Sequence, residues 1–174
     1  TERYLGGLLD TRSGHLHPLN YTLGLAAAAE AAGAVIHEDS LVTGIEHGAT
    51  ATVRTARGSV KARHVVLCCN AYLDETISKP LRARIMPVGT YIVATEPLGA
   101  ERMRALMREN YAITDINWVL DYFRRSADHR LLFGGRVSYS GVDPAGTARA
   151  TRARMLKVYP QLAEAAIEYA WGGE

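Results

Sequence analysis

Apolar and polar positions change their spacing several times along the chain, and each change marks a predicted element. Residues 20–32 are rich in alanine and leucine, which predicts a helix with Asn20 as its N-cap. Gly33 stands where a left-handed residue commonly ends such a helix. Residues 34–37 then read as a short strand. A helix followed by a strand forms half of an α/β unit.

From Leu41 onward the apolar residues recur with the spacing of strands. Short turns separate three such segments, which predicts an antiparallel meander over residues 41–46, 50–55 and 59–67. The last strand runs into the sequence HVVLCCNAYL, whose first six residues are apolar enough for a strand covered on both faces. It stops at Asn70 and Ala71, either because the chain turns there or because a ligand approaches the backbone.

Longer extended segments and helices follow a short helical or irregular passage through residues 72–78, which Pro80 closes. The pattern predicts an extended segment over residues 82–98, bent at Pro87 and Gly89, and then an amphipathic helix over residues 99–110. Residues 116–136 are predicted to form a hairpin that turns at residues 127–129. Residues 145–173 are predicted to form a helix broken at Pro160, a second short helix and a strand.

These elements place the chain in the α+β or α/β class, with two parts of different character. Residues 1–78 combine a helix, a strand and an antiparallel meander. Residues 79–174 combine a mixed or antiparallel sheet with flanking helices. With 174 residues the chain is long enough for one good core, or for two small lobes that share an interface.

Composition and charge exclude several classes of partner. A hydrophobic fraction of 48% with 22% charged residues is ordinary for a folded protein, and a net charge of +2 does not favour a nucleic-acid partner. The spacing of four basic residues favours a solvated helix surface over a phosphate site: Arg149, Arg152, Arg154 and Lys157. Since no apolar run approaches the roughly 18 residues of a membrane span, we expect a cytoplasmic protein.

Cysteine and histidine give little sign of chemistry. Cys68 and Cys69 are adjacent in the predicted strand and are interpreted as buried small hydrophobic residues, with a vicinal disulfide as the alternative. His15 and His17 flank Leu16 and are expected to have a loop role, because no second cluster of ligands supports a metal site. We therefore predict no metal.

The common catalytic motifs are missing from this sequence. There is no GxSxG, HExxH, P-loop or GxGxxG pattern. Paired carboxylates at residues 38–39 and 74–75 lie in loops or at helix starts, where acidic residues stabilise the positive end of the helix dipole. No catalytic acid or base is predicted.

The order of segments nevertheless resembles the FAD-dependent amine oxidoreductases of the D-amino acid oxidase superfamily. The resemblance is carried by GGLLDTRSGHLHPLNYTLGLAAAAEAAGAVIHEDSLVTGIE and VRTARGSVKARHVVLCCNAYL, and it covers essentially the whole chain. The later segments MPVGTYIVATEPL and WVLDYFRRSADHRLLFGGR are most similar to the branch that acts on gamma-glutamylated polyamines such as gamma-glutamylputrescine.

The resemblance implies a partial Rossmann-like FAD-binding domain over residues 1–78 and a substrate-binding domain over residues 79–174. In such proteins the main chain at the position of Val42 pairs with the adenine of FAD. The strand end at Asn70 and Ala71 would lie beside the adenosine and pyrophosphate, where small residues admit the cofactor.

The same resemblance implies that parts of the cofactor site lie outside this sequence. The family's amino-terminal strand, glycine-rich turn and helix bind the pyrophosphate, and a further flavin-contacting segment follows the substrate domain. Neither is found between Thr1 and Glu174. We therefore expect a central fragment that binds FAD poorly by itself and is inactive.

For the substrate, the resemblance implies that the inner face of the second sheet covers the flavin ring. The candidate substrate residues are Tyr91, Trp118, Tyr122 and Arg136. Gly134 and Gly135 indicate either close approach of the flavin or substrate to the strand, or a bulge.

The implied reaction is oxidation of a small-molecule amine to an imine, which water converts to an aldehyde or keto product and ammonia while oxygen is reduced to hydrogen peroxide. Two alternatives stay open. One is a flavin dehydrogenase that acts on another amine or a 2-hydroxy acid. The other is a non-catalytic module that does not bind FAD.

Overall fold

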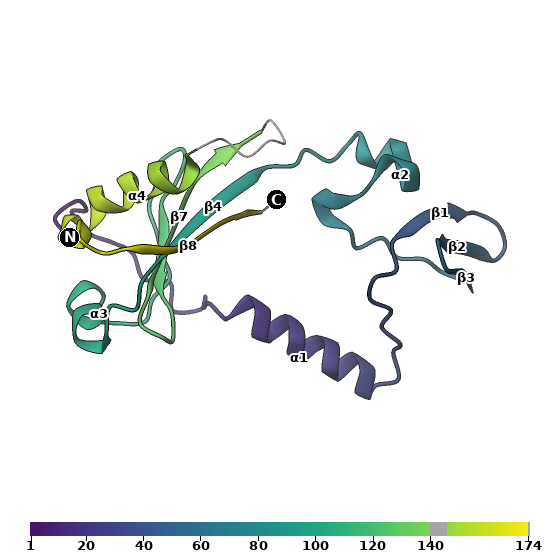
Figure 1. Ribbon diagram of the computed structural model, residues 1–174, viewed down its shortest axis with the longest axis horizontal. Helices are drawn as coiled ribbons and strands as arrows, with labels where there is room; N and C mark the ends of the chain where they lie inside the picture. Colours follow the sequence, from purple (N-terminus) through teal and green to yellow (C-terminus); the bar gives the residue numbers. More distant parts are fainter. Residues whose placement is uncertain (140–145, 174) are drawn as a thin grey trace. The chain divides into compact units, whose positions relative to one another are not determined.

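The computed structural model describes residues 1–139 and 146–173, and the chain divides into two compact units (Figure 1). One unit is Leu16–Pro87, and the other combines Thr1–His15 with Val88 and the residues that follow it. The N-terminal segment belongs to the second unit because the Tyr4 ring stacks on Phe123, with centroids 6.4 Å apart. The observed division therefore differs from the predicted one at residues 1–15 and 79–87. The functional assignment of the two parts stays a prediction.

The first unit begins with the predicted helix, α1 (Pro18–Ala31). Asn20 was the wrong N-cap: the cap is His17, whose Nδ1 accepts a hydrogen bond from the Asn20 amide at 3.2 Å. Proline is well suited to the first position of a helix, so the helix starts at Pro18. Gly33 adopts the predicted left-handed conformation with φ 93°.

The predicted meander is confirmed as an antiparallel sheet in the order β1-β2-β3. Its strands are β1 (Val42–Glu46), β2 (Ala51–Thr55) and β3 (Gly58–Ala62). Asn70 and Ala71 follow in a short 3₁₀ turn, η1 (Asn70–Tyr72). Next comes α2 (Glu75–Arg82), where Asp74 is the N-cap, Ser78 breaks the helical geometry, and the helix continues past Pro80.

Two strand predictions in this unit were wrong. Residues 34–37 form no strand, and β3 ends at Ala62, so that residues 64–69 have no strand pairing to any described residue. Val66 is 81% exposed, and both cysteines are exposed and free rather than buried. An apolar run becomes a buried strand only where other strands and layers cover it. The described residues of this unit supply no such cover.

The second unit is built on a five-stranded antiparallel sheet in the order β5-β6-β7-β4-β8. The strands are β4 (Gly89–Thr95), β5 (Ile113–Thr114), β6 (Tyr122–Arg125), β7 (Leu131–Ser138) and β8 (Ile167–Gly173). The predicted hairpin is confirmed as β6 and β7. Its turn places His129 in the left-handed region with φ 63°.

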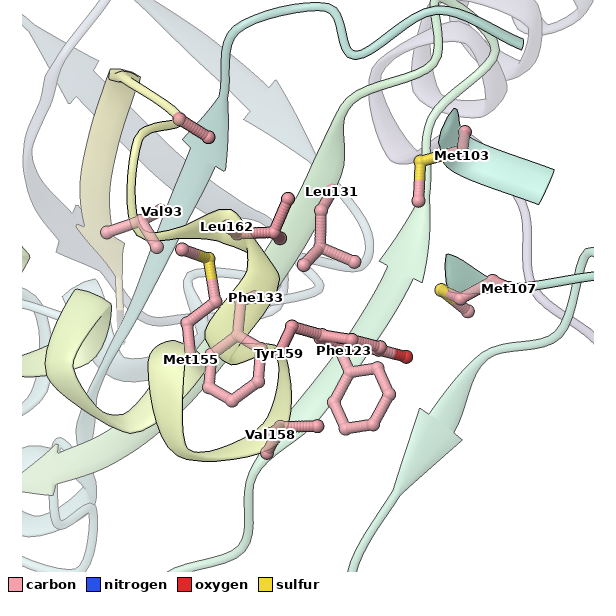
Figure 2. Close-up of a cluster of buried hydrophobic side chains, with 11 residues drawn as sticks. Val93, Met103, Met107, Phe123, Leu131, Phe133, Met155, Val158, Tyr159 and Leu162 are labelled. Atoms are coloured by element: carbon pink, nitrogen blue, oxygen red, sulfur yellow. The ribbon is translucent and has the colours of Figure 1, made fainter. Parts of the chain in front are cut away.

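Helices cover one side of this sheet. They are α3 (Ala100–Leu106), α4 (Thr147–Val158) and the 3₁₀ turn η2 (Pro160–Leu162), and α4 lies along β4, β7 and β8 (Figure 1). Figure 2 shows the core between them, where Phe123 stacks on Phe133 at 5.4 Å and meets Tyr159 edge-on at 5.5 Å. Helices with two antiparallel sheets agree with the predicted α+β class. Among the described helices none is long and apolar enough to cross a membrane.

Candidate functional site

The two faces of the five-stranded sheet have different side chains. Val93 and Phe133 are buried in the core that includes α4. Because side chains alternate along a strand, their neighbours point to the other side of the sheet. We call this other side the open face and define it by Ile92, Tyr122, Gly134, Tyr169 and Trp171. Tyr169 is 53% exposed and Trp171 is 46% exposed, so the open face offers aromatic surface for binding.

Tyr122, a predicted substrate residue, lies flat on the open face because Gly134 has no side chain. The two residues are paired across β6 and β7. A Cβ atom added at Gly134 would lie only 2.1 Å from the Tyr122 ring. Tyr122 of this chain therefore occupies the space above Gly134. The predicted close approach of the flavin or substrate to this strand stays a prediction.

Arg136, a second predicted substrate residue, is the extra residue of a β-bulge. Thr90 pairs with Val137 and Tyr91 pairs with Gly135, which leaves Arg136 unpaired with φ 64°. The bulge alternative for the glycine pair is thus confirmed. Bulges turn a side chain away from the regular alternation and are frequent beside binding sites. Within residues 1–139 and 146–173, the half-buried Arg136 has no ion pair with a carboxylate.

Tyr91, the third candidate, lies on the opposite side of the sheet from Tyr122. It is 5% exposed and shares the face of Val93. A Cβ atom at Gly172 would lie 2.6 Å from the Tyr91 ring, so the ring packs closely on β8. Tyr91 also lines a pocket of about 180 Å³ beside the N-terminal half of α4, together with Thr151. The structure therefore does not bring Tyr91 together with Tyr122.

Trp118, the fourth candidate, stands in the loop between β5 and β6. We call residues 115–121 the Trp118 loop. Trp118 is 99% exposed and Ile116 is fully exposed. Two aspartates at the ends of this loop, Asp115 and Asp121, make hydrogen bonds that sequence reasoning missed, because no motif marks them.

Asp121 ties the loop to α4. Its side chain is 4% exposed, and its Oδ1 accepts a hydrogen bond from Arg154 Nε at 2.5 Å. Arg154 Nη2 also donates to the Val119 carbonyl at 2.5 Å. The prediction of a solvated basic helix surface is therefore wrong for Arg154, although Arg149 is exposed. Sequence spacing identified the helix but gave no sign of the buried partner.

Asp115 holds the other end of the loop. Its Oδ1 accepts hydrogen bonds from the amides of Asn117 and Asp121, at 3.1 and 3.0 Å. Burial by itself would raise the pKa of Asp115, but the hydrogen bonds from Asp121, Asn117 and Tyr4 outweigh it and lower the pKa. The carboxylate is therefore ionised and acts as an acceptor at neutral pH.

The predicted cofactor residues belong to the other unit. Val42 is half-buried at the start of β1, where it pairs with Thr55. Asn70 is exposed in the left-handed region with φ 50°, a conformation that asparagine tolerates better than most residues. Ala71 adds only a methyl group. Asn70 is exposed and Ala71 is half-buried, and their short side chains leave room beside the backbone of the turn for a cofactor.

The two histidines have structural contacts. His17 caps α1, whereas the His15 ring contacts the Asn110 carbonyl and the Arg124 guanidinium, each at 2.9 Å. Among the described residues, no group of three or more histidine, cysteine, aspartate or glutamate side chains could hold a metal ion.

Comparison with known proteins links these features to one family. The family model described as DAO, FAD dependent oxidoreductase, matches residues 1–173. The chain is 43% identical to the gamma-glutamylputrescine oxidoreductase of Escherichia coli K12 over 99% of its length, and it covers 41% of that protein. The chain thus spans about two fifths of the length of this relative.

Two solved structures share the fold. Glycine oxidase from Geobacillus kaustophilus superposes with a TM-score of 0.67 at 22% identity, over 87% of this chain and 40% of that one. L-proline dehydrogenase from P. horikoshii superposes with a TM-score of 0.70 at 21% identity, over 90% of this chain and 42% of that one. At this level of identity the likeness establishes the fold alone.

Proposed function

The chain belongs to the family of FAD dependent oxidoreductases, and from this premise we propose that it is the central part of a flavoenzyme that oxidises a small-molecule amine. The observation that carries the proposal is the 43% identity to gamma-glutamylputrescine oxidoreductase over 99% of the chain. We propose gamma-glutamylputrescine, or a similar amine with a methylene chain, as the substrate.

Residues of the unit Leu16–Pro87 would contact the cofactor. FAD, when bound, supplies the redox chemistry by accepting a hydride from the carbon that carries the amine. The main chain at Val42 would hold the adenine. Asn70 and Ala71 would admit the adenosine and pyrophosphate, because Asn70 is exposed and neither residue has a long side chain.

Residues of the five-stranded sheet would orient the substrate. The Tyr122 ring, fixed on Gly134, offers a flat apolar surface with a hydroxyl at its edge. Arg136 would attract a carboxylate of the substrate, because bidentate pairing with a carboxylate is what a guanidinium does best. Aromatic side chains on the open face would also exclude water from the bound amine. We assign no catalytic base to this chain.

The first test is a titration with FAD followed by flavin fluorescence. It compares the 174-residue chain with a chimera that carries the flanking segments of the Escherichia coli relative at both ends. We expect the chimera to bind FAD stoichiometrically and the chain alone to bind weakly. If the chimera binds no FAD, the cofactor assignment is wrong.

The second test asks which substrate reduces the bound flavin. The FAD-loaded chimera is mixed without oxygen with gamma-glutamylputrescine, with simple amines or with 2-hydroxy acids, and bleaching of the flavin is followed. We expect bleaching by gamma-glutamylputrescine. Bleaching by a 2-hydroxy acid alone contradicts the amine proposal. Peroxide measured in air then separates an oxidase from a dehydrogenase.

A matched pair of variants tests the cofactor turn in the chimera. Ala71→Leu would place a bulky side chain where we propose that FAD passes, so we expect FAD affinity to fall by about tenfold or more. Ala56→Leu makes the same change at the exposed turn between β2 and β3 and should leave the affinity unchanged. Equal FAD affinities for both variants would remove Ala71 from the site.

A further inference from the structure

We propose that Asp115 and Asp121 are positioning residues that hold the Trp118 loop in one shape, so that Trp118 and Ile116 present an apolar surface to the methylene chain of the amine substrate. The substrate part of this inference rests on the proposed function. The positioning part rests on the geometry of the loop alone.

The first observation is that the loop is closed on itself by one carboxylate. Asp115 N donates to the Asp121 carbonyl at 3.0 Å, and Asp121 N donates to Asp115 Oδ1 at 3.0 Å. Asp115 Oδ2 accepts from the Asn117 side-chain amide and from the Tyr4 hydroxyl. One side chain thus fixes the start, the middle and the end of the loop.

The second observation is that the end of the loop is attached to the sheet and to α4. The Arg154 guanidinium donates one hydrogen bond to Asp121 Oδ1 and another to the Val119 carbonyl. A Cβ atom at Gly135 would lie 2.8 Å from Asp121 Oδ1 and 3.3 Å from the Leu120 carbonyl, so the loop sits directly on the β7 backbone. This attachment leaves little freedom for the residues in between.

The third observation is the contrast between a fixed backbone and exposed side chains. Trp118 is 99% exposed and Ile116 is 103% exposed, yet both lie between anchored residues. Ordering a loop normally costs about 1–2 kcal/mol per residue on binding. A loop that is already ordered avoids most of that loss, which is the usual advantage of a preorganised site.

The fourth observation is continuity with the candidate site. Asp121 is followed by Tyr122 of the open face, and the Leu120 carbonyl would lie 3.3 Å from a Cβ atom at Gly135, the neighbour of the bulged Arg136. The Trp118 loop therefore adjoins two of the proposed substrate residues. Indole and isoleucine side chains bind methylene groups and gain nothing from a short, polar amine. The chemistry favours an amine with a methylene chain.

Positioning is tested on the chain itself by fluorescence. The chain has two tryptophans, so Trp171→Phe leaves Trp118 as the sole indole for time-resolved anisotropy. In this background we expect Asp115→Asn and Asn117→Ala to raise the amplitude of fast indole motion by roughly twofold. Asp128→Asn is the matched control, since Asp128 accepts hydrogen bonds in the β6–β7 turn. Circular dichroism verifies that each variant is folded.

An unchanged amplitude in Asp115→Asn and Asn117→Ala overturns the positioning role. Asn117 is exposed, so its variant keeps this test valid even where Asp115→Asn does not fold. This readout needs neither FAD nor substrate. It therefore still decides the positioning role when the proposed function fails.

Recognition of the substrate is tested by steady-state kinetics on the FAD-loaded chimera. For Trp118→Ala we expect KM for gamma-glutamylputrescine to rise by about tenfold, with a smaller change for methylamine and little change in kcat. Asp115→Asn should also raise KM for gamma-glutamylputrescine more than KM for methylamine. Asp128→Asn should leave the ratio of the two KM values unchanged. Equal changes for both amines overturn the recognition role. Failure of every amine overturns the substrate assignment together with the proposed function.

Discussion

At the scale of single residues, Gly135 shows how one missing methyl group shapes the candidate site. A Cβ atom there would lie 2.8 Å from Asp121 Oδ1, a side chain that is itself held by Arg154 and cannot move freely. We expect Gly135→Ala to lower the free energy of unfolding by about 1–3 kcal/mol. Urea unfolding measures this change.

Gly173→Ala is the control for Gly135→Ala, because an added Cβ at Gly173 has open space around it. It should change stability by less than about 0.5 kcal/mol. Similar values for the two glycines would contradict the tight fit of the Trp118 loop on β7.

Tyr159 gives the protein a pH dependence of known sign. Burial raises the pKa of its hydroxyl from 10.0 to about 12, with a smaller contribution from Tyr4. Between pH 10 and pH 12 the unfolded chain loses this proton while the folded protein keeps it. The stabilising contribution is thus complete below pH 10 and is lost as the pH rises through 12.

We therefore expect Tyr159→Phe to remove part of the fall in stability on the alkaline side. The loss in the free energy of unfolding between neutral and alkaline pH should be smaller in Tyr159→Phe by about 1–2 kcal/mol. This is less than the whole pKa shift would give, since solvent screening reduces the effect. Urea unfolding of both proteins at several alkaline pH values measures it. Parallel pH profiles would contradict the assignment to Tyr159.

Sequence alone could identify some of these residues and not others. The pair Gly134 and Gly135 was informative because glycine in a strand has few explanations, and the bulge, one of the two predicted, was found. Asp115 and Asp121 could not be predicted. Their role depends on hydrogen bonds to residues that the fold brings near, such as Tyr4 and Arg154.

At the scale of elements, the Arg154–Asp121 ion pair fastens α4 to the Trp118 loop. Arg154→Leu would leave the Asp121 carboxylate buried without its cation, which costs about 3–5 kcal/mol in proteins generally. We expect a loss of about 3 kcal/mol, measured by urea unfolding. Arg149→Leu changes an exposed arginine of the same helix and should cost less than about 0.5 kcal/mol.

A double variant isolates the pair. Adding Asp121→Asn to Arg154→Leu removes the unpaired charge, so the double variant should recover part of the lost stability. Additive losses would mean that the two side chains act independently.

Elements with their own local signals were predictable. The helix at residues 18–31, the meander and the β6–β7 hairpin follow from apolar spacing and turn residues, which are local. Residues 34–37 and 64–69 were not, because strand formation there depends on partners rather than on the segment itself. An apolar sequence predicts that a segment is buried, but it does not predict which strands or layers bury it.

At the scale of the whole molecule, the two units differ in how much apolar surface they cover. The second unit has a closed core in which Phe133, Leu131 and Met155 are fully buried. In the unit Leu16–Pro87, Leu23 of α1 is 59% exposed and Val66 is 81% exposed. Where exposed apolar side chains gather in a large patch, they mark a surface that binds a partner. The chain covers 41% of its relative from Escherichia coli, and we propose that the flanking segments of the proposed flavoenzyme cover these side chains.

The thiols of Cys68 and Cys69 report on that surface, because they lie in the exposed segment 64–69. We expect both to react with a thiol reagent in the 174-residue chain within about tenfold of the rate of a free thiol. The FAD-loaded chimera should react at least about tenfold more slowly, because burial protects a thiol until the structure opens.

Ala165→Cys in a Cys68→Ser, Cys69→Ser background gives the rate of a buried thiol, since Ala165 is 2% exposed. Slow reaction in the chain itself would contradict the exposed segment. Equal rates in the chain and the chimera would mean that the flanking segments do not cover it, and that its apolar residues serve another partner.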